Sequence, residues 1–132
     1  MALPKILLAD DDTDDKSIIQ EAMESLDAAD TMCFADNGVH AWEVLESHYT
    51  SAAKPCLIVL DLNMPKMNGT NTLRRLKDDP RFKDIPVIIY STSINPLEKA
   101  RCIQLGAYAY LTKPLSFKES LERARTFLEF CK

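Results

Sequence analysis

Asp61 follows an unbroken run of four apolar residues, Leu57–Leu60, and Pro65 and Gly69 then turn the chain. An apolar run of this length, bounded by turn-forming residues, predicts a strand that is buried on both faces of a sheet. A carboxylate at the end of such a strand is held rigidly and still meets solvent. Asp61 is therefore the first candidate for a residue that reacts or binds a metal ion.

Three other apolar segments also run into side chains that can do chemistry. Ligands of parallel sheets bind outside the carboxyl ends of the strands, so these side chains would converge with Asp61. They are Asp10, Asp11 and Asp12 after the segment 5–9, Ser91 and Thr92 after the segment 86–90, and Lys113 just beyond the segment 107–111.

Carboxylates that lie close together repel one another, and one of them tends to take up a proton unless a cation lies between them. A set of oxygen ligands favours a hard cation such as Mg²⁺, which keeps several waters and needs only one or two carboxylates. Lys113 would add a positive charge for a phosphoryl oxygen, and Ser91 would add a hydroxyl donor. These groups together could stabilise the transfer of a phosphoryl group to a carboxylate.

Hydrophobic periodicity predicts a helix after each predicted strand. Apolar residues recur at a spacing of three and four in 18–26, 39–49, 70–77 and 95–105, and again in the segment after Ser116. The predicted strands are 5–9, 31–35, 56–60, 86–90 and 107–111, and residues 50–55 are expected to form a loop.

This alternation of strands and helices predicts an α/β fold. Right-handed crossovers leave few topologies, and five units suit a flavodoxin-like five-stranded parallel sheet in the order 2-1-3-4-5, with five helices on both faces. In that order the first and third strands are neighbours about 4.8 Å apart, so their terminal acids would share one small volume. Residues 1–132 are expected to form a single domain, with no output domain attached.

The composition of the chain limits the classes of binding partner and the cellular compartment that we expect. A net charge of −4 argues against nucleic-acid binding, which usually needs a basic patch. No apolar run approaches the roughly 20 residues of a membrane span, and the N-terminus is not a secretory signal, so we expect a cytoplasmic protein with no membrane partner. The four cysteines, which include no CxxC pair, favour free thiols over disulfides or a metal site; they are Cys33, Cys56, Cys102 and Cys131.

Four separated motifs add to this pattern. They are LLADD (7–11), LDLNMPKMNG (60–69), PVIIYSTS (86–93) and GAYAYLTKP (106–114). With these motifs in this order on alternating strands and helices, the chain resembles the receiver domain of two-component response regulators, in its single-domain form similar to chemotaxis regulators. The resemblance covers essentially the whole length.

The resemblance implies a role for each residue at the strand ends. Asp61 would be the phosphoacceptor, which takes a phosphoryl group from a phosphohistidine on a sensor histidine kinase or a phosphotransfer protein. Asp11, Asp61 and the backbone carbonyl of Asn63 would bind Mg²⁺ directly, and Asp10 would bind it through a water. Lys113 would contact the phosphoryl group.

The resemblance also implies a switch. Ser91 falls at the position of the switch hydroxyl, where Thr is more frequent in the family, and Tyr110 falls at the aromatic residue that turns inward. Phosphorylation would then change the surface formed by the helix 95–105, the strand 107–111 and the last helix, which would bind a downstream protein of unknown identity. The last helix carries more apolar residues than a single stripe needs, namely Phe127, Leu128 and Phe130, so we expect this surface to dock a partner or to join two copies of the chain in a homodimer.

Two other interpretations are weaker. A flavin binder on the same fold would need a Gly/Ser/Thr-rich phosphate loop after the first strand, which the chain lacks. A small Mg²⁺-dependent phosphohydrolase of the haloacid dehalogenase type also combines a strand-end Asp with Ser, Lys and an acidic pair. In that class the nucleophile precedes the acidic pair, and Asn63 could not serve as its general acid, so we prefer a signalling switch that is not an enzyme beyond slow self-dephosphorylation.

Asp14 and Asp15 are assigned to the helix start, where acids suit the helix dipole.

Overall fold

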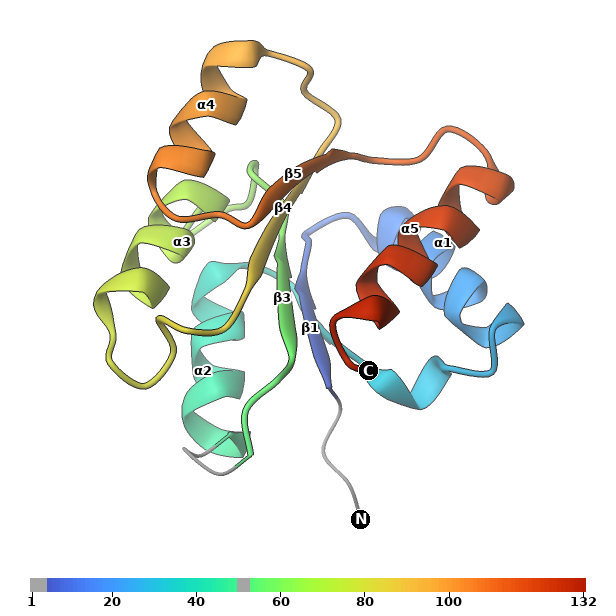
Figure 1. The fold of residues 1–132 in the computed structure, drawn as a ribbon, viewed down its shortest axis with the longest axis horizontal. Coiled ribbons are helices and arrows are strands. Elements are labelled where there is room, and N and C mark those ends of the chain that lie inside the picture. The colour runs from blue at the N-terminus through green and yellow to red at the C-terminus, as the bar shows by residue number, and fades with distance from the viewer. Residues whose placement is uncertain (1–4, 50–52) are drawn as a thin grey trace.

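The computed structural model describes residues 5–49 and 53–132. Five strands form one parallel sheet in the order β2-β1-β3-β4-β5 (Figure 1). The predicted α/β fold and strand order are confirmed. Ala9 pairs with Leu60, so the first and third strands end level with each other. The strands are β1 (Ile6–Ala9), β2 (Met32–Ala35), β3 (Leu57–Leu60), β4 (Val87–Ser91) and β5 (Ala109–Thr112).

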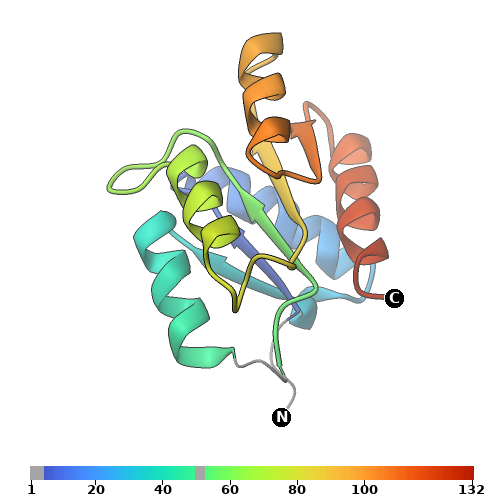
Figure 2. The same cartoon turned by 60° about the vertical axis from the view of Figure 1, so that its left-hand side comes forward.

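Helices cover both faces of the sheet, as Figures 1 and 2 show from two directions. The helices α1 and α5 pack on one face, and α2, α3 and α4 pack on the other. Their bounds within the described residues are α1 (Thr13–Ser25), α2 (Gly38–His48), α3 (Gly69–Asp78), α4 (Pro96–Gln104) and α5 (Phe117–Glu129), with a short 3₁₀ helix, η1 (Ala29–Thr31), before β2.

Side-chain caps decide where the helices begin. Asn37 and Asn68 accept hydrogen bonds from the backbone N–H groups of the first turns of α2 and α3, so each helix starts one residue earlier than predicted. Asp12 caps α1 in the same way, through the N–H groups of Asp14 and Asp15. The predicted loop at residues 50–55 falls partly outside the described residues.

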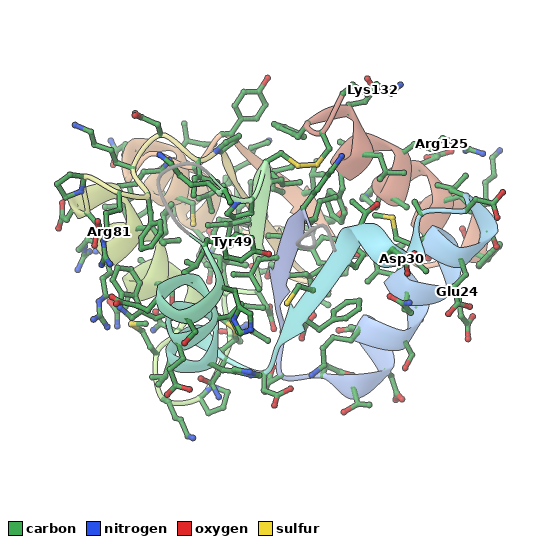
Figure 3. All side chains as sticks on the ribbon, turned by 90° about the horizontal axis from the view of Figure 1, so that it is seen from below. Glu24, Asp30, Tyr49, Arg81, Arg125 and Lys132 are labelled. Atoms are coloured by element: carbon green, nitrogen blue, oxygen red, sulfur yellow. A yellow bond between two sulfur atoms is a disulfide. The ribbon has the colours of Figure 1, made fainter. Side chains whose placement is uncertain are left out.

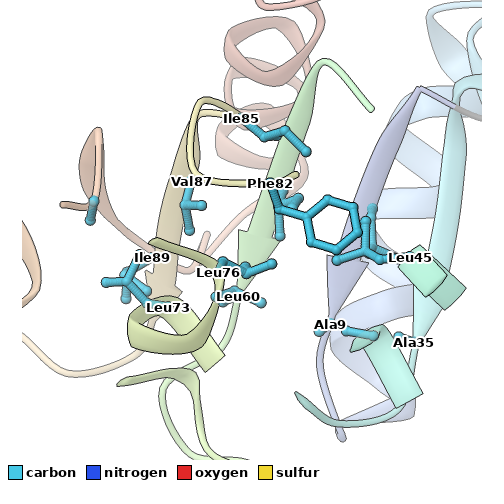
Figure 4. Close-up of a cluster of buried hydrophobic side chains, with 14 of the residues drawn as sticks. Ala9, Ala35, Leu45, Leu60, Leu73, Leu76, Phe82, Ile85, Val87 and Ile89 are labelled. Atoms are coloured by element: carbon cyan, nitrogen blue, oxygen red, sulfur yellow. The ribbon is translucent and has the colours of Figure 1, made fainter. Parts of the chain in front are cut away.

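Strand residues alternate between two hydrophobic clusters, one on each face. Leu7 and Ile58 belong to the cluster beneath α2 and α3, part of which Figure 4 shows. Ile6 and Leu57 belong to the cluster beneath α1 and α5. Of the nine described residues of α4, Cys102 alone is buried, so this helix is attached to the first cluster by little apolar surface.

The packed face of α5 differs from the predicted one. Phe127, which was expected beyond the apolar stripe, is fully buried against Tyr90, whereas Phe117 is 49% exposed. Ser120 and Ala124 complete the buried side of the helix. Phe127 therefore belongs to the core and cannot contribute to an exposed surface.

A disulfide joins Cys56, just before β3, to Cys131 at the end of the chain (Figure 3). The prediction of four free thiols is wrong for this pair and holds for Cys33 and Cys102. The two linked residues are 75 positions apart, so their spacing carries no motif, and only the fold brings their Cα atoms to 5.4 Å. None of the helices in the described part of the chain is both long and apolar enough to cross a bilayer.

Breaking the Cys56–Cys131 disulfide should lower the free energy of unfolding by about 2–4 kcal/mol, because the link closes a long loop in the unfolded chain. Urea unfolding of the wild type with and without a thiol reductant measures the difference. Cys131→Ser should lose the response to reductant, and Cys33→Ser, which removes a free thiol, should keep it. A wild type whose unfolding ignores the reductant would contradict this expectation.

Candidate functional site

The carboxyl ends of β1 and β3 bring Asp10 and Asp61 together. Each follows one member of the Ala9–Leu60 pair, and the backbone N–H of Asp61 donates to the carbonyl of Ala9 at 2.9 Å. Asp10 is fully buried, Asp61 is 6% exposed, and Asp11 is exposed beside them. One carboxylate oxygen from each of the three residues lies within 4.8 Å of the others, so the structure brings the predicted acids into one cluster.

Gly69 fixes the loop that follows Asp61. Its backbone N–H donates to the carbonyl of Leu62 at 3.0 Å, which folds the start of α3 back against the end of β3. A Cβ atom at this position would collide with the carbonyl oxygen of Asp61, so the close approach requires glycine. The backbone that carries Asp61 is thus held from both sides.

Lys113 reaches the cluster from β5, and its backbone N–H donates to the carbonyl of Ser91 at 2.9 Å. The side chain of Lys113 is 8% exposed, and its Nζ lies 2.8 Å from Asp10 Oδ2 and 3.5 Å from Asp61 Oδ2. The third acid at this ammonium is Asp15, whose Oδ2 lies 2.7 Å from Nζ. An ammonium that enters a group of carboxylates in this way offsets part of their mutual repulsion.

Sequence reasoning missed the role of Asp15, which it assigned to the helix dipole. One signal could have found it, because Asp15 stands four residues before Ile19, and residues at that spacing share a helix face. Ile19 is fully buried, so the face of α1 that carries Asp15 is turned toward the sheet. Asp14 is exposed in the first turn of α1, in agreement with its predicted helix-start role, and Asp12, for which no such role was predicted, is the N-cap of the helix.

One buried oxygen of the cluster lacks a hydrogen-bond partner. Asp10 Oδ1 accepts from the N–H of Asp12 at 2.9 Å, but Asp10 Oδ2 has no hydrogen-bonded partner among the described residues. The ammonium of Lys113 is near it without hydrogen-bond geometry. This oxygen is therefore stabilised mainly by the charge of Lys113, and a cation held with Asp11 and Asp61 would add to that stabilisation.

The environment of Asp61 favours its protonated form. Burial, followed by the neighbouring charge of Asp10, raises the pKa of Asp61 from 3.8 to about 6, although Lys113 opposes the shift. Burial works to lower the pKa of Lys113, but its ion pairs with Asp10 and Asp15 outweigh burial and raise that pKa above its ordinary value. The lysine is therefore a permanent cation in this site.

Ser91 and Tyr110, the predicted switch residues, meet at a residue that the sequence did not single out. Ser91 is fully buried, and its Oγ accepts from the N–H of Ser93 at 3.1 Å. The Tyr110 hydroxyl donates to the Ser93 carbonyl at 2.9 Å, with the ring 9% exposed, so the aromatic side chain points inward. Thr92 is exposed, which favours Ser91 as the hydroxyl that faces the interior.

Asn63 lies on the exposed loop after β3. Its backbone N–H is 3.5 Å from Asp61 Oδ1, the outer limit of a hydrogen bond. The predicted use of its carbonyl as a metal ligand stays a prediction.

Comparison with known proteins places this geometry in a family. The family model described as the response regulator receiver domain matches residues 6–125. Chemotaxis protein CheY1 of Helicobacter pylori is 33% identical over 121 residues, which cover 89% of this chain and 94% of that protein. Response regulator Rcp1 of Synechocystis is 32% identical over 116 residues, which cover 86% of this chain and 79% of that protein.

Solved structures agree with the sequence relatives. The phosphorylated cyanobacterial phytochrome response regulator RcpA has a TM-score of 0.83 and 34% identity, with 98% of this chain and 94% of that chain covered. The Mn²⁺-bound form of response regulator Rcp1 has a TM-score of 0.79 and 29% identity, with 97% and 94% covered.

The raised pKa of Asp61 predicts a pH-dependent effect of Asp61→Asn on stability. The folded chain binds a proton at Asp61 more tightly than the unfolded chain does, so the ionised carboxylate destabilises the fold above pH about 6. In buffer without divalent metal, Asp61→Asn should therefore raise the free energy of unfolding by about 2–3 kcal/mol at pH 7.5.

This gain should shrink as the pH falls from 6 toward 3.8, because the folded wild type is protonated there while the unfolded chain is still largely ionised, and it should vanish below 3.8, where both states are protonated. Urea unfolding at pH 7.5 and pH 4.5 measures the two differences. Asp30→Asn, at an exposed carboxylate in η1, is the matched control and should change stability little at either pH. A loss of stability in Asp61→Asn at pH 7.5 would show that the carboxylate cluster is not repulsive.

Proposed function

We propose that this chain, which belongs to the response regulator receiver domain family, accepts a phosphoryl group on Asp61. The donor would be a phosphohistidine on a sensor histidine kinase or a phosphotransfer protein. The observation that supports this proposal best is the convergence of Asp10, Asp11, Asp61 and Lys113 at the ends of three strands. A nucleophile, a cation-binding pair and a fixed ammonium are the parts that phosphoryl transfer to a carboxylate needs.

In the proposed reaction an ionised Asp61 oxygen attacks phosphorus while the bond from phosphorus to the donor nitrogen breaks. The product is an acyl phosphate on Asp61, and the imidazole of the donor leaves with the electron pair of the broken bond. Lys113 donates a hydrogen bond to an oxygen of the phosphoryl group in transit. The backbone contacts of Asp61 hold the attacking oxygen in place, so little reorganisation is needed.

Mg²⁺ is the proposed metal ion, held by Asp11, Asp61 and the carbonyl of Asn63, with Asp10 acting through a water. The close carboxylates of Asp10, Asp11 and Asp61, with their oxygen-only donor set, support a hard divalent cation at this place. When bound, such an ion would neutralise charge on the phosphoryl oxygens. A relative, Rcp1, has been solved in an Mn²⁺-bound form, which agrees with a divalent site in the family.

The proposed output surface is α4, β5 and α5. The Ser91 hydroxyl would move toward the phosphoryl group. Because Ser91 Oγ accepts from the Ser93 N–H, this movement would shift Ser93, whose carbonyl accepts from the Tyr110 hydroxyl. Ile94, just before α4, and Leu97, in its first turn, are 82% and 80% exposed and would be available to a downstream protein or to a second copy of the chain. Phosphorylation would shift a pre-existing equilibrium of this surface rather than create a new shape.

The phosphohydrolase alternative is not supported, because both the family match and the structural neighbours are receiver domains. We propose a switch that is modified once per cycle and then loses its phosphoryl group slowly. A stand-alone role, in which the signal passes to a separate protein, agrees with single-domain relatives such as CheY1.

Incubation with Mg²⁺ and a small acyl phosphate should add the mass of one phosphoryl group to the wild type and nothing to Asp61→Asn. Intact mass spectrometry is the measurement. Excess metal chelator should suppress the addition, because the oxygens of the phosphoryl group would then lack their cation. Asp30→Asn should be modified like the wild type, and a phosphoryl group on Asp61→Asn would move the acceptor elsewhere.

Phosphorylation, or a stable mimic such as beryllofluoride, should increase the fraction of dimer if the proposed α4-β5-α5 surface joins two copies. Sedimentation velocity with and without the mimic measures this fraction. Leu97→Asp places a charge on the exposed start of α4 and should return the protein to monomer. A wild type that stays monomeric with the mimic bound would exclude the homodimer.

A further inference from the structure

We propose that Asp15 is a positioning residue, which holds the Lys113 ammonium beside Asp61 and keeps it ready for an incoming phosphoryl group. This inference deepens the proposed function of Asp61 and rests on it. Asp15 lies on α1, outside the acidic cluster that would hold the metal ion.

The contacts of Lys113 are unequal. The bond from its Nζ to Asp15 Oδ2 is the shortest of the three, at 2.7 Å, and it has the geometry of a hydrogen bond. The approach to Asp10 Oδ2 is nearly as short, at 2.8 Å, and Asp61 Oδ2 lies farther away at 3.5 Å. The ammonium is therefore held most closely by Asp15 and Asp10, and Asp61 is its most distant anionic partner.

The backbone around Asp15 is fixed independently of the site. Asp12 caps the helix by accepting from the N–H groups of Asp14 and Asp15, and Ile19 anchors the next turn in the core. Asp15 is thus presented by a rigid first turn, 98 residues away in sequence from the lysine that it binds. A lysine ammonium is a point charge on a flexible stem, so its position depends on partners of this kind.

Removing the Asp15 carboxylate would leave the ammonium with Asp10 and Asp61 as its anionic neighbours in the described site. Lys113 would then move toward Asp61 and close the 3.5 Å separation to a direct hydrogen bond. That bond would occupy an oxygen of the nucleophile and withdraw the donor from the place where the phosphoryl oxygens arrive. Because an ammonium has three N–H donors, it can keep one on Asp15 and turn another to the phosphoryl group.

Repulsion of the donor by Asp15 is the competing effect, and the same variants detect it. Asp15 adds a negative charge near a site that must accept an anionic donor. If that charge acted chiefly by repulsion, removing it would speed phosphorylation and lower the donor concentration needed for half-maximal rate. Positioning predicts a slower maximal rate with the half-maximal concentration unchanged.

The test measures the rate of phosphoryl incorporation against the concentration of a small acyl phosphate, with Mg²⁺ present. Asp15→Ala should lower the maximal rate about tenfold. Asp15→Asn should recover part of the loss, since its amide oxygen still accepts from the ammonium. Asp14→Ala removes the same charge from the same helical turn, away from Lys113 in the described structure, and should stay within about twofold of the wild type.

A double-mutant cycle separates positioning from a general effect on the fold. In a Lys113→Met background, Asp15→Ala should have no further effect on the rate. Urea unfolding of the same four proteins, without donor or metal, should show coupling between Asp15 and Lys113, and this readout does not depend on phosphorylation.

The outcomes distinguish the two proposals. A wild type that takes up no phosphoryl group overturns the function of Asp61 even if the unfolding cycle shows the ion pair. A modified wild type whose rate is equalled or exceeded by Asp15→Ala overturns the role of Asp15 and leaves the function of Asp61 standing. An equal loss from Asp15→Ala in the Lys113→Met background also overturns it.

Discussion

Repulsion between two buried carboxylates is the constraint around which this site is built. The pairing of β1 with β3 leaves Asp10 and Asp61 no freedom to separate, because each follows directly from a strand of the same sheet. Burial prevents water from screening them, and the raised pKa of Asp61 is the result. A single ammonium, from Lys113, reaches both acids and leaves part of their charge uncompensated. The fold therefore carries an electrostatic cost at this edge that a cation would relieve.

The rest of the structure holds the acids in place in spite of their repulsion. Two hydrophobic clusters hold the strands from both faces, so the acids cannot relax by bending the sheet. Gly69 allows the start of α3 to pack directly against the backbone of Asp61, which restricts the movement of the nucleophile. Preorganised groups of this kind need not move when charge develops, which is how a folded site differs from the same residues in solution.

Much of this arrangement could be predicted from the sequence, because the strand pattern and the residues at the strand ends are local signals. Alternating strands and helices led to the order of the sheet, and the order led to the meeting of Asp10 with Asp61. The rest depends on contacts between distant segments. The Asp15–Lys113 bond and the Cys56–Cys131 disulfide span 98 and 75 residues, and no spacing in the sequence identifies the partner of Asp15 or of Cys56.

Because α4 buries little apolar surface, it is expected to be the least stable of the helices that cover the sheet. A helix with Cys102 as its buried residue loses little hydrophobic contact when it slides or frays, whereas α5 would have to withdraw Phe127 from the interior. Local opening of α4 should therefore need less free energy than opening of α5, and α4 lies next to Ser93 and Tyr110. Amide hydrogens of this helix should exchange with solvent sooner than those of the helices on the opposite face, which makes α4 the natural reporter of events at the carboxylates.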